Sequence, residues 1–352
     1  MFTSRFPIAL VALLSFIATS SVNAYSGSGE GGFPDFITQW PLFQRWQSMT
    51  DSIPEFDVPG LDDVSVGDYV LGEKKLTWMC YTLQAEATPL VPTTGSVVIE
   101  KATLSYNEDG EDKTDTVVSK RSYSDMRAVL YGAKLQKSLN HPNILPIHHF
   151  VVGKTARRTY GFALMPYVAA GSLENNYASY ADQGAINGAF KQMLSAVAAV
   201  SSAGIIHRDL KPENFLKDGD DLKLMDFDQS RDVGTTAQMD VGTPSYTAPE
   251  IISGVDYSTK ADTFSLGMSY LVMSVSDLRN SDTRFQLWKD LIEPSPGSFY
   301  PTASKIEEIL KDRNYAVFGG NDGLLQVIAK SLCKAEERYT PGEFEAAFGG
   351  AV

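Results

Sequence analysis

The residues best suited to chemistry lie together in one short stretch, His-Arg-Asp-Leu-Lys-Pro-Glu-Asn, at positions 207–214. Asp209, Lys211 and Asn214 fall within six residues of one another in this stretch. A carboxylate can orient an attacking hydroxyl, an ammonium can neutralise a transferring phosphate, and an amide oxygen can bind Mg²⁺. The stretch lies between an expected helix and an expected strand, so it should form a loop that presents the three groups together. Their types and spacing therefore predict phosphoryl transfer.

A second acidic stretch, Leu-Met-Asp-Phe-Asp-Gln-Ser, follows at positions 224–230. Its first aspartate, Asp226, comes directly after an expected strand, where an oxygen ligand for Mg²⁺ is well placed. Carboxylate and amide oxygens suit this hard cation, which keeps water ligands and shares phosphate oxygens with its substrate. The two stretches thus contain oxygen groups of the kind that Mg²⁺ prefers, on Asp226 and on Asn214.

The elements that must position these groups fall into two regions. Residues 96–122 are predicted to form a β-hairpin, because strand-forming runs flank a polar turn that contains Gly110. Residues 77–84 read as a further strand, and residues 124–140 have helical spacing of apolar residues. Beyond position 165 the pattern is helical, with expected helices at residues 189–203, 262–274 and, as the last one, 324–335. The sequence thus predicts an α+β fold with a small β-rich lobe and a larger helical lobe.

Three motifs in order carry a resemblance to a known family. The 207–214 stretch, the Asp-Phe-Asp stretch and Gly-Thr-Pro-Ser-Tyr-Thr-Ala-Pro-Glu at positions 242–250 together resemble the eukaryotic-type protein kinase family. Lys211 is similar to the serine/threonine branch of that family. The resemblance implies a two-lobed kinase fold and transfer of the γ-phosphate of ATP, with Mg²⁺, to serine or threonine hydroxyls of a protein substrate.

The resemblance also implies individual roles. Asp209 would be the catalytic base and Lys211 a phosphate contact, while Asn214 and Asp226 would bind Mg²⁺. The adenine ring would lie against the backbone near Met165, which is similar to the family's gatekeeper. The structural and regulatory positions that match the family are His207, Arg208, Asp228, Thr243, Glu250, Asp262 and Arg338.

Several of these positions have a more specific expected contact. Arg208 would anchor an activation loop over residues 228–247, and Asp262 would hold the backbone of the catalytic loop. Arg338 would pair with Glu250. His207 is expected to pack and orient its neighbours rather than carry a proton. Near the adenine, Tyr167 and Val168 would offer backbone groups, whereas Pro166 has no amide proton to donate.

The small lobe departs from the family pattern at its phosphate-binding loop. Such a loop needs glycines so that backbone N–H groups can approach phosphate oxygens. Before the expected hairpin, residues 85–96 contain only Gly95, and the alternative segment 71–78 contains only Gly72. Nucleotide binding is therefore expected to be weaker than usual or altered.

A second departure concerns the strand lysine. Lys120 is the better match to the family's Val-Ala-Ile-Lys motif, and Lys101 on the preceding strand is the alternative. The family pairs this lysine with a helix glutamate, yet no glutamate lies between Lys120 and His141, and the expected position holds Gly132. One hypothesis is that Asp228 replaces this glutamate, by contacting Lys120 or a second metal ion. The alternative is that Asp228 is a tolerated surface residue.

Because of these departures, three functions remain possible for the chain. The intact large-lobe groups favour an active protein serine/threonine kinase. The poor glycine loop, the missing glutamate and Asp228 favour a pseudokinase that binds or scaffolds other proteins without turnover. A kinase-like enzyme for a small molecule is a third alternative, against which Ala248-Pro249-Glu250 argues.

Composition narrows the partners and the compartment. A net charge of −13 is unfavourable for a general nucleic-acid or anionic-membrane surface. Arg5, the apolar run 8–18 and small residues before position 25 form the pattern of a secretory signal peptide cleaved after Ala24. The alternative, a membrane anchor, would need about 20 apolar residues, and the apolar run 8–18 is too short for that. The resemblance implies ATP and Mg²⁺ as cofactors and a protein substrate. The net charge and the N-terminal pattern add the expectation of no nucleic acid, no stable membrane insertion after cleavage, and a secreted protein.

The expected domain organisation follows from these patterns. Residues 1–24 form the signal peptide, 25–65 a glycine/serine linker with an N-terminal extension, and 66–350 the kinase-like domain. Its small lobe would span about residues 66–165 and its large lobe about 166–350. The two cysteines, Cys80 and Cys333, allow a single disulfide, although two buried, unpaired thiols are favoured.

Overall fold

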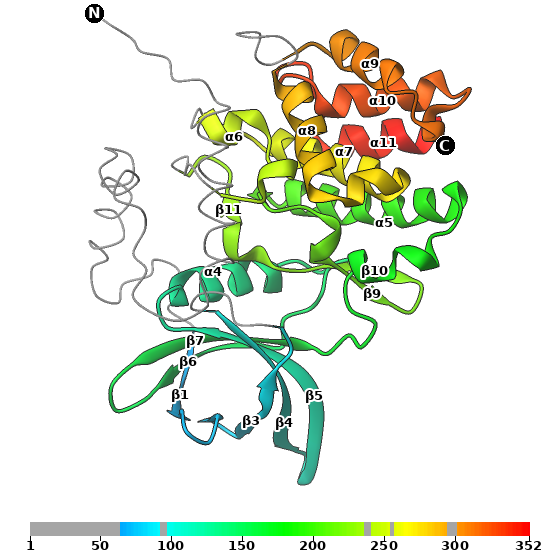
Figure 1. Cartoon of the computed structure of the whole chain (residues 1–352). Coiled ribbons are helices and arrows are strands. Elements are labelled where there is room, and N and C mark those ends of the chain that lie inside the picture. Colours follow the sequence, from blue (N-terminus) through cyan, green and yellow to red (C-terminus); the bar gives the residue numbers. More distant parts are fainter. Residues whose placement is uncertain (1–63, 92–96, 236–240, 254–256, 294–300) are drawn as a thin grey trace, which may run out of the picture.

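A computed structural model of this chain describes residues 64–91, 97–235, 241–253, 257–293 and 301–352. The described residues form two lobes, a small one built from strands and a larger one built mainly from helices (Figure 1). The expected signal peptide, nearly all of the segment expected after it, and Gly95 lie outside these residues. Within them, none of the helices is both long and apolar enough to cross a membrane.

The small lobe is a closed sheet around an aromatic and aliphatic core. Its strands are β1 (Ser65–Val70), β2 (Lys75–Trp78), β3 (Tyr81–Pro89), β4 (Val98–Glu108), β5 (Glu111–Ser122), β6 (His149–Lys154) and β7 (Thr159–Pro166). They are hydrogen-bonded in the order β1-β2-β3-β4-β5-β7-β6, and parallel pairing of β1 with β6 closes the sheet. Leu76, Val117 and Phe162 are almost completely buried in its interior.

The expectation of one strand over residues 77–84 was wrong, because the chain reverses within it. β2 ends at Trp78 and β3 begins at Tyr81, and Met79 between them has a φ of +47°. The rings of Trp78 and Tyr81 stack across the turn with centroids 5.1 Å apart. Neither glycine nor proline marks this turn, so the usual sequence signals of a reversal are missing.

The hairpin expected over residues 96–122 is confirmed. β4 and β5 pair in antiparallel register, and Asp109 and Gly110 form the two-residue turn between them. Both turn residues have positive φ, +54° and +85°, a geometry that an Asp-Gly pair adopts readily in a type I′ turn. β5 also pairs with β7, which places Lys120 opposite Ala163 on an interior strand of the sheet.

One helix of the small lobe, α4 (Met126–Lys137), lies between the sheet and the larger lobe (Figure 1). Val129, Leu130 and Ala133 are buried, in agreement with the apolar spacing of residues 124–140. The helix ends at Lys137, and Leu139 packs on the large-lobe core just beyond it.

The large lobe is a helical assembly around one hydrophobic core. Its α-helices are α5 (Gln183–Ser202), α6 (Pro249–Ser253), α7 (Lys260–Ser274), α8 (Ser281–Ile292), α9 (Ala303–Asp312), α10 (Asp322–Leu332) and α11 (Pro341–Ala351). The helix expected at residues 262–274 is confirmed as α7, and every one of its residues from Ala261 to Met273 is buried, as its nearly continuous apolar sequence indicates. The α+β, two-lobed architecture predicted from the sequence is also confirmed.

Two of the expected helices have other bounds than predicted. α5 begins at Gln183 rather than at residue 189, because the Asp182 side chain accepts a hydrogen bond from the backbone N–H of Ala185 and caps the helix there. Its end agrees with the sequence, since Gly204 follows with a φ of +75°. The helix expected at residues 324–335 spans Asp322–Leu332 instead.

That helix is also not the last one, because α11 follows it. Thr340 and Glu343 form a capping box at the start of α11, in which each side chain accepts a hydrogen bond from the other residue's backbone N–H. Pro341 occupies the first helical turn, where its missing N–H costs nothing. Phe344 and Phe348 of α11 are buried against the lobe core.

Two short sheets of the large lobe carry the segments that hold the candidate chemistry. β8 (Ile205–Ile206) pairs with β11 (Arg231–Asp232), and β9 (Phe215–Asp218) pairs with β10 (Asp221–Leu224). The segment after α4 joins this region, because the backbone N–H of Leu145 donates to the Leu224 carbonyl at 2.9 Å. The two lobes therefore meet beside the Asp226 segment.

Candidate active site

The 207–214 loop follows β8 and is held by a buried carboxylate from α7. The two oxygens of Asp262 accept hydrogen bonds from the backbone N–H groups of His207, at 2.7 Å, and Arg208, at 2.9 Å. Burial raises the pKa of the Asp262 carboxyl above its ordinary value. Arg208 has a φ of +72°, a conformation that non-glycine residues keep only where surrounding contacts impose it. Asp262 supplies such contacts.

Asp209 is the centre of a polar cluster in this loop. One carboxylate oxygen accepts a hydrogen bond from the Thr243 hydroxyl at 2.7 Å, and the other lies 3.0 Å from the Lys211 ammonium. Lys211 also donates to the Thr243 hydroxyl oxygen at 2.6 Å. The structure therefore brings Asp209, Lys211 and Thr243 together, and it shows that the Asp209 carboxylate can receive a hydroxyl proton donor.

Asn214 contacts Asp209 as well. Its amide nitrogen donates to the backbone carbonyl of Asp209 at 2.7 Å and to the carboxylate at 3.1 Å. Because both hydrogen bonds use the nitrogen, they orient the amide so that its oxygen faces away from Asp209. The backbone carbonyl of Asn214 accepts from Met225 N–H at 2.9 Å, which ties the loop to the residue before Asp226.

The Asp226 segment packs on the 207–214 loop. Asp226 has a φ of +66°, in the left-handed region, and Phe227 is almost completely buried. The Phe227 ring meets the His207 ring edge to face with centroids 4.7 Å apart. His207 is fully buried and burial lowers its pKa, so the imidazole is neutral near pH 7. His207 therefore packs and orients its neighbours.

Lys120 connects the small lobe to this segment. Its ammonium lies 2.7 Å from a carboxylate oxygen of Asp226 and 2.7 Å from one of Asp228. The alternative, Lys101 on β4, has a different environment: it lies 3.5 Å from the exposed carboxylate of Glu86 and over the Tyr167 ring at 4.9 Å from its centroid. The structure thus places Lys120, and not Lys101, against the candidate metal ligand.

The charges of Lys120, Asp226 and Asp228 shift one another's pKa values. Burial alone would lower the pKa of Lys120, but the carboxylates of Asp226 and Asp228 raise it above its ordinary value. Burial likewise opposes ionisation of Asp226, but Lys120 offsets that effect and lowers its pKa. Burial and the nearby Asp226 charge raise the pKa of Asp228. Lys120 is therefore a charged ammonium held between two carboxyl groups.

The oxygen donors of the cluster fit Mg²⁺ with a phosphate substrate. Within the described residues, no group of three His, Cys, Asp or Glu side chains could hold a metal ion. Asp226 and Asn214 supply a carboxylate and an amide oxygen, and Mg²⁺ is commonly bound through one or two carboxylates plus substrate phosphates and water. The residues present therefore suit a cation that arrives with phosphate oxygens, and not a site enclosed by protein alone.

Apolar side chains from both lobes lie beside Lys120. Met165 is buried at the end of β7 and belongs to a core cluster that also includes Val129 and Ala133 of α4. Partly exposed apolar residues pack against this cluster, namely Val118, Phe150, Val168, Leu216 and Met225. Met165 and Val168 were expected from the sequence, whereas Val118 and Leu216 were missed.

Only Val118 had a signal in the sequence. It lies two residues from Lys120 on β5, and residues two apart in a strand share a face. Leu216 lies on β9, whereas Asn214 lies in the turn before that strand, so the same rule does not connect them. The exposed apolar surface of Val118 and Leu216 at the joint of the lobes suits a flat, apolar ring. Tyr167, by contrast, faces Lys101 through its ring.

The segment after Asp228 is held at both ends. Near its start, Arg208 donates from Nε to the Gln229 carbonyl at 2.5 Å, which agrees with an anchoring contact to this segment. Near its end, Gly242 lies so close to the Arg208 carbonyl that a Cβ atom there would be 2.6 Å from that oxygen. Residues 236–240 lie outside the described part of the chain.

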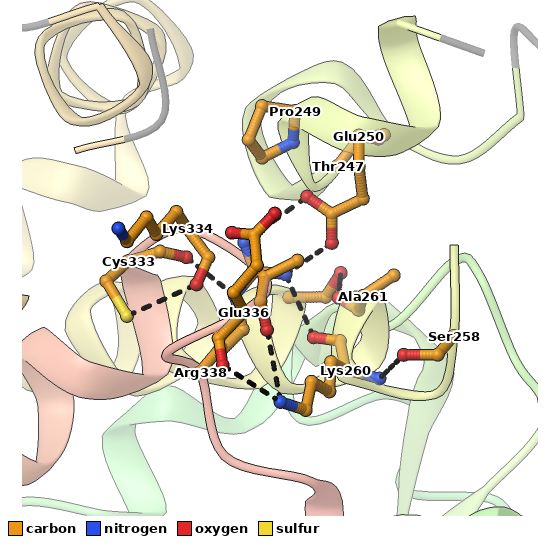
Figure 2. A network of polar contacts seen from close by, with 12 residues as sticks. Thr247, Pro249, Glu250, Ser258, Lys260, Ala261, Cys333, Lys334, Glu336 and Arg338 are labelled. Carbon is orange, nitrogen blue, oxygen red and sulfur yellow. Dashed lines mark hydrogen bonds and ion pairs between the residues drawn. The ribbon is translucent and has the colours of Figure 1, made fainter. Parts of the chain in front are cut away.

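Glu250 and Arg338 form a buried ion pair behind this segment (Figure 2). The guanidinium lies 2.5 Å from one carboxylate oxygen and 3.3 Å from the other. It also donates to the backbone carbonyls of Cys333, at 2.8 Å, and Lys260, at 3.0 Å. Arg338 thus ties the 248–250 motif to the start of α7 and to the loop before α11.

Comparison with known proteins assigns the family. A model described as the protein kinase domain matches residues 112–336, which is more than half of the chain. A probable myosin light chain kinase of Dictyostelium discoideum is 27% identical over 220 residues, covering 59% of this chain and 55% of the relative. The hormonally up-regulated neu tumor-associated kinase of Mus musculus is 28% identical over 221 residues, covering 60% of this chain and 29% of the relative.

The serine/threonine-protein kinase chk-2 of Caenorhabditis elegans is 33% identical over 160 residues, which cover 42% of this chain and 33% of the relative. The chain thus spans between about a third and about half of the length of these curated relatives. The matched region begins within β5 and includes the catalytic loop, the Asp226 segment and the Glu250 motif. This chain belongs to the eukaryotic-type protein kinase domain family.

Proposed function

We propose that this chain is a protein serine/threonine kinase that transfers the γ-phosphate of Mg-ATP to hydroxyl groups of a protein substrate. The observation that carries the proposal is the convergence of Lys120 from the small lobe with Asp226 from the large lobe, next to Asp209 and Asn214. Phosphoryl transfer depends mainly on positioning and on electrostatic stabilisation. Asp209 can position the attacking hydroxyl, and Lys120, Lys211 and the metal ligands can stabilise the charge on the phosphate.

Each residue has a part that its contacts support. Asp209 would receive the proton donor of a substrate hydroxyl, in the way that it accepts the Thr243 hydroxyl at 2.7 Å. Lys211 would balance negative charge on the transferring group, and Asn214 and Asp226 would hold Mg²⁺. Bound Mg²⁺ would neutralise charge on the phosphate oxygens. Lys120 would contact the other phosphates, and the apolar side chains of Val118 and Leu216 would cover the adenine ring.

A protein substrate is favoured over a small molecule by the 242–250 segment. Thr243 is hydrogen-bonded to Asp209, and Glu250 is locked by Arg338, so this segment presents a fixed surface beside the catalytic carboxylate. Lys211 and the curated serine/threonine kinase relatives favour serine and threonine as acceptors. The departures at Gly132 and Asp228 make the enzyme atypical for its family.

The decisive experiment measures phosphate transfer from γ-labelled Mg-ATP to a mixture of protein and peptide acceptors. The wild-type chain should transfer phosphate, and Asp209→Asn should reduce the rate by about 10²–10⁴-fold, the usual contribution of a general base. Both proteins should gain thermal stability with Mg-ADP, because Asp209 does not hold the nucleotide. Absence of transfer by both, without any nucleotide-induced stabilisation, would instead support the pseudokinase alternative.

We further propose that the chain is exported and cleaved after Ala24. The support is the pattern of residues 1–24, which lie outside the described part of the structure. Expression in a secreting host followed by N-terminal sequencing of the released protein tests this, and Tyr25 should be the first residue. Retention of the intact N-terminus inside the cell would contradict the proposal.

A further inference from the structure

Helix α4 has no carboxylate directed at Lys120, but the segment after Asp226 does. The Asp228 carboxylate lies 2.7 Å from the Lys120 ammonium, and the two side chains are 18% and 9% exposed. Asp228 is therefore not a surface residue. A largely buried carboxylate that contacts a buried ammonium makes a stronger interaction than an exposed pair does, because water screens it less.

Gly132 of α4 is the structural counterpart of this contact. A Cβ atom at position 132 would lie 2.6 Å from the carbonyl carbon and oxygen of Phe227 and 2.8 Å from the backbone nitrogen of Asp228. Real Cβ atoms do not approach backbone atoms so closely, so only glycine allows α4 to rest on residues 227–228. Two departures from the family pattern thus meet at one point in space.

We propose that Asp228 is the positioning residue for Lys120, and that Gly132 makes this possible by admitting the 227–228 backbone against α4. In this chain the carboxylate that holds Lys120 belongs to Asp228, in the segment after the candidate metal ligand Asp226, and not to helix α4. For nucleotide binding the inference rests on the proposed function, but the Lys120–Asp228 pair is independent of it.

The Lys120–Asp228 pair matters because Asp226 has two proposed partners, the Lys120 ammonium and Mg²⁺. Asp226 contacts Lys120 at 2.7 Å and is also the candidate Mg²⁺ ligand, and one carboxylate engaged by a cation holds the lysine less strongly. Asp228 supplies a second carboxylate at the same distance. Lys120 therefore stays directed into the site while Asp226 is engaged with the metal ion and its phosphates.

The test is a double-mutant cycle on Lys120 and Asp228, read by calorimetric titration of the full chain with Mg-ADP. Asp228→Asn should weaken Mg-ADP binding by about tenfold, the loss expected for one charge-assisted hydrogen bond. In a Lys120→Met background, Asp228→Asn should cause no further loss, because the partner is already gone. A merely structural role for Asp228 would not depend on Lys120 in this way.

The matched control is Asp232→Asn, an acid-to-amide change in the same segment. Asp232 contacts helix α4 through the Tyr131 hydroxyl and does not touch Lys120, so this variant should bind Mg-ADP like the wild type. Gly132→Ala tests the second half of the inference and should weaken Mg-ADP binding, whereas Gly188→Ala, at a site with open space, should not. Unchanged binding by Gly132→Ala would overturn the role given to Gly132.

Two outcomes would overturn the role given to Asp228: wild-type affinity in Asp228→Asn, or an equal loss with and without Lys120. If the wild type itself fails to bind Mg-ADP, the proposed function fails and the pair is judged by urea unfolding of the same four proteins without nucleotide. Non-additive midpoints would then support the Lys120–Asp228 pair, and additive midpoints would refute it.

Discussion

Arg338 and Glu250 lie 88 positions apart in the sequence, yet they form an ion pair that is almost completely removed from solvent. Three separate segments depend on it, since the same guanidinium also binds the carbonyls of Lys260 and Cys333 (Figure 2). A buried charge that loses its partner remains uncompensated in a medium of low polarity. A single substitution of Arg338 or Glu250 is therefore expected to lower the stability of the large lobe.

Arg338→Ala should lower the free energy of unfolding by about 3–5 kcal/mol, because it leaves the Glu250 carboxylate buried without its cation. Urea unfolding followed by circular dichroism measures this. The matched control is Lys334→Ala, which removes an exposed ion pair with Glu337 and should leave the midpoint unchanged. Equal effects of the two variants would show that burial of the Arg338 pair has no special weight.

Gly267→Ala should destabilise the large lobe by about 1–3 kcal/mol, the usual effect of overpacking. A Cβ atom there would come too close to the Ser331 hydroxyl oxygen and would lie 3.0 Å from the Leu332 side chain, so these buried side chains of α10 would have to shift. Gly188→Ala in α5 has open space instead and should stabilise by about 0.5–1 kcal/mol, because alanine favours the helix. Melting curves of both variants should therefore shift in opposite directions, and a common direction would contradict the packing argument.

Removal of Mg²⁺ with EDTA should abolish measurable ADP binding by the wild-type chain. Asp226 places a carboxylate where phosphate oxygens would lie, and without a cation the two negative groups repel each other. Asp226→Asn should bind Mg-ADP at least about tenfold more weakly, which corresponds to about 1.4 kcal/mol. Calorimetric titration with and without EDTA checks both statements, and binding that is insensitive to EDTA would argue against the assigned metal ligand.

The two cysteines should differ sharply in reactivity. Both thiols are unpaired, as expected, but the expectation that both are buried was wrong for Cys80, which is exposed. Cys333 is buried, and burial raises the pKa of its thiol to about 11. The thiolate is the reactive form, so at pH 8 Cys333 is both inaccessible and almost entirely protonated. A thiol reagent such as 5,5′-dithiobis(2-nitrobenzoate) should titrate one group per native chain quickly and two after unfolding. A disulfide would instead give no thiol in either state.

The candidate residues of the large-lobe site could be predicted from the sequence. Asp209, Lys211 and Asn214 lie within one loop, so their order along the chain already places them near one another. The hairpin at residues 96–122 was equally readable, because Asp109-Gly110 is a local turn signal. Helix α7 was readable as well, since a long apolar run with few polar residues must be covered on all sides.

The tertiary structure decided what depends on distant segments. The closure of the small-lobe sheet by β1 and β6, and the turn at Met79, have no strong local signal. The choice of Lys120 over Lys101 required knowing which strand faces Asp226, 106 residues further along the chain. The sequence raised Asp228 as a hypothesis, but only the fold brings its carboxylate to Lys120 and lays Gly132 on the backbone beside it. Local propensity fixes turns and helices, whereas contacts between distant residues are fixed by packing, which a single sequence does not state.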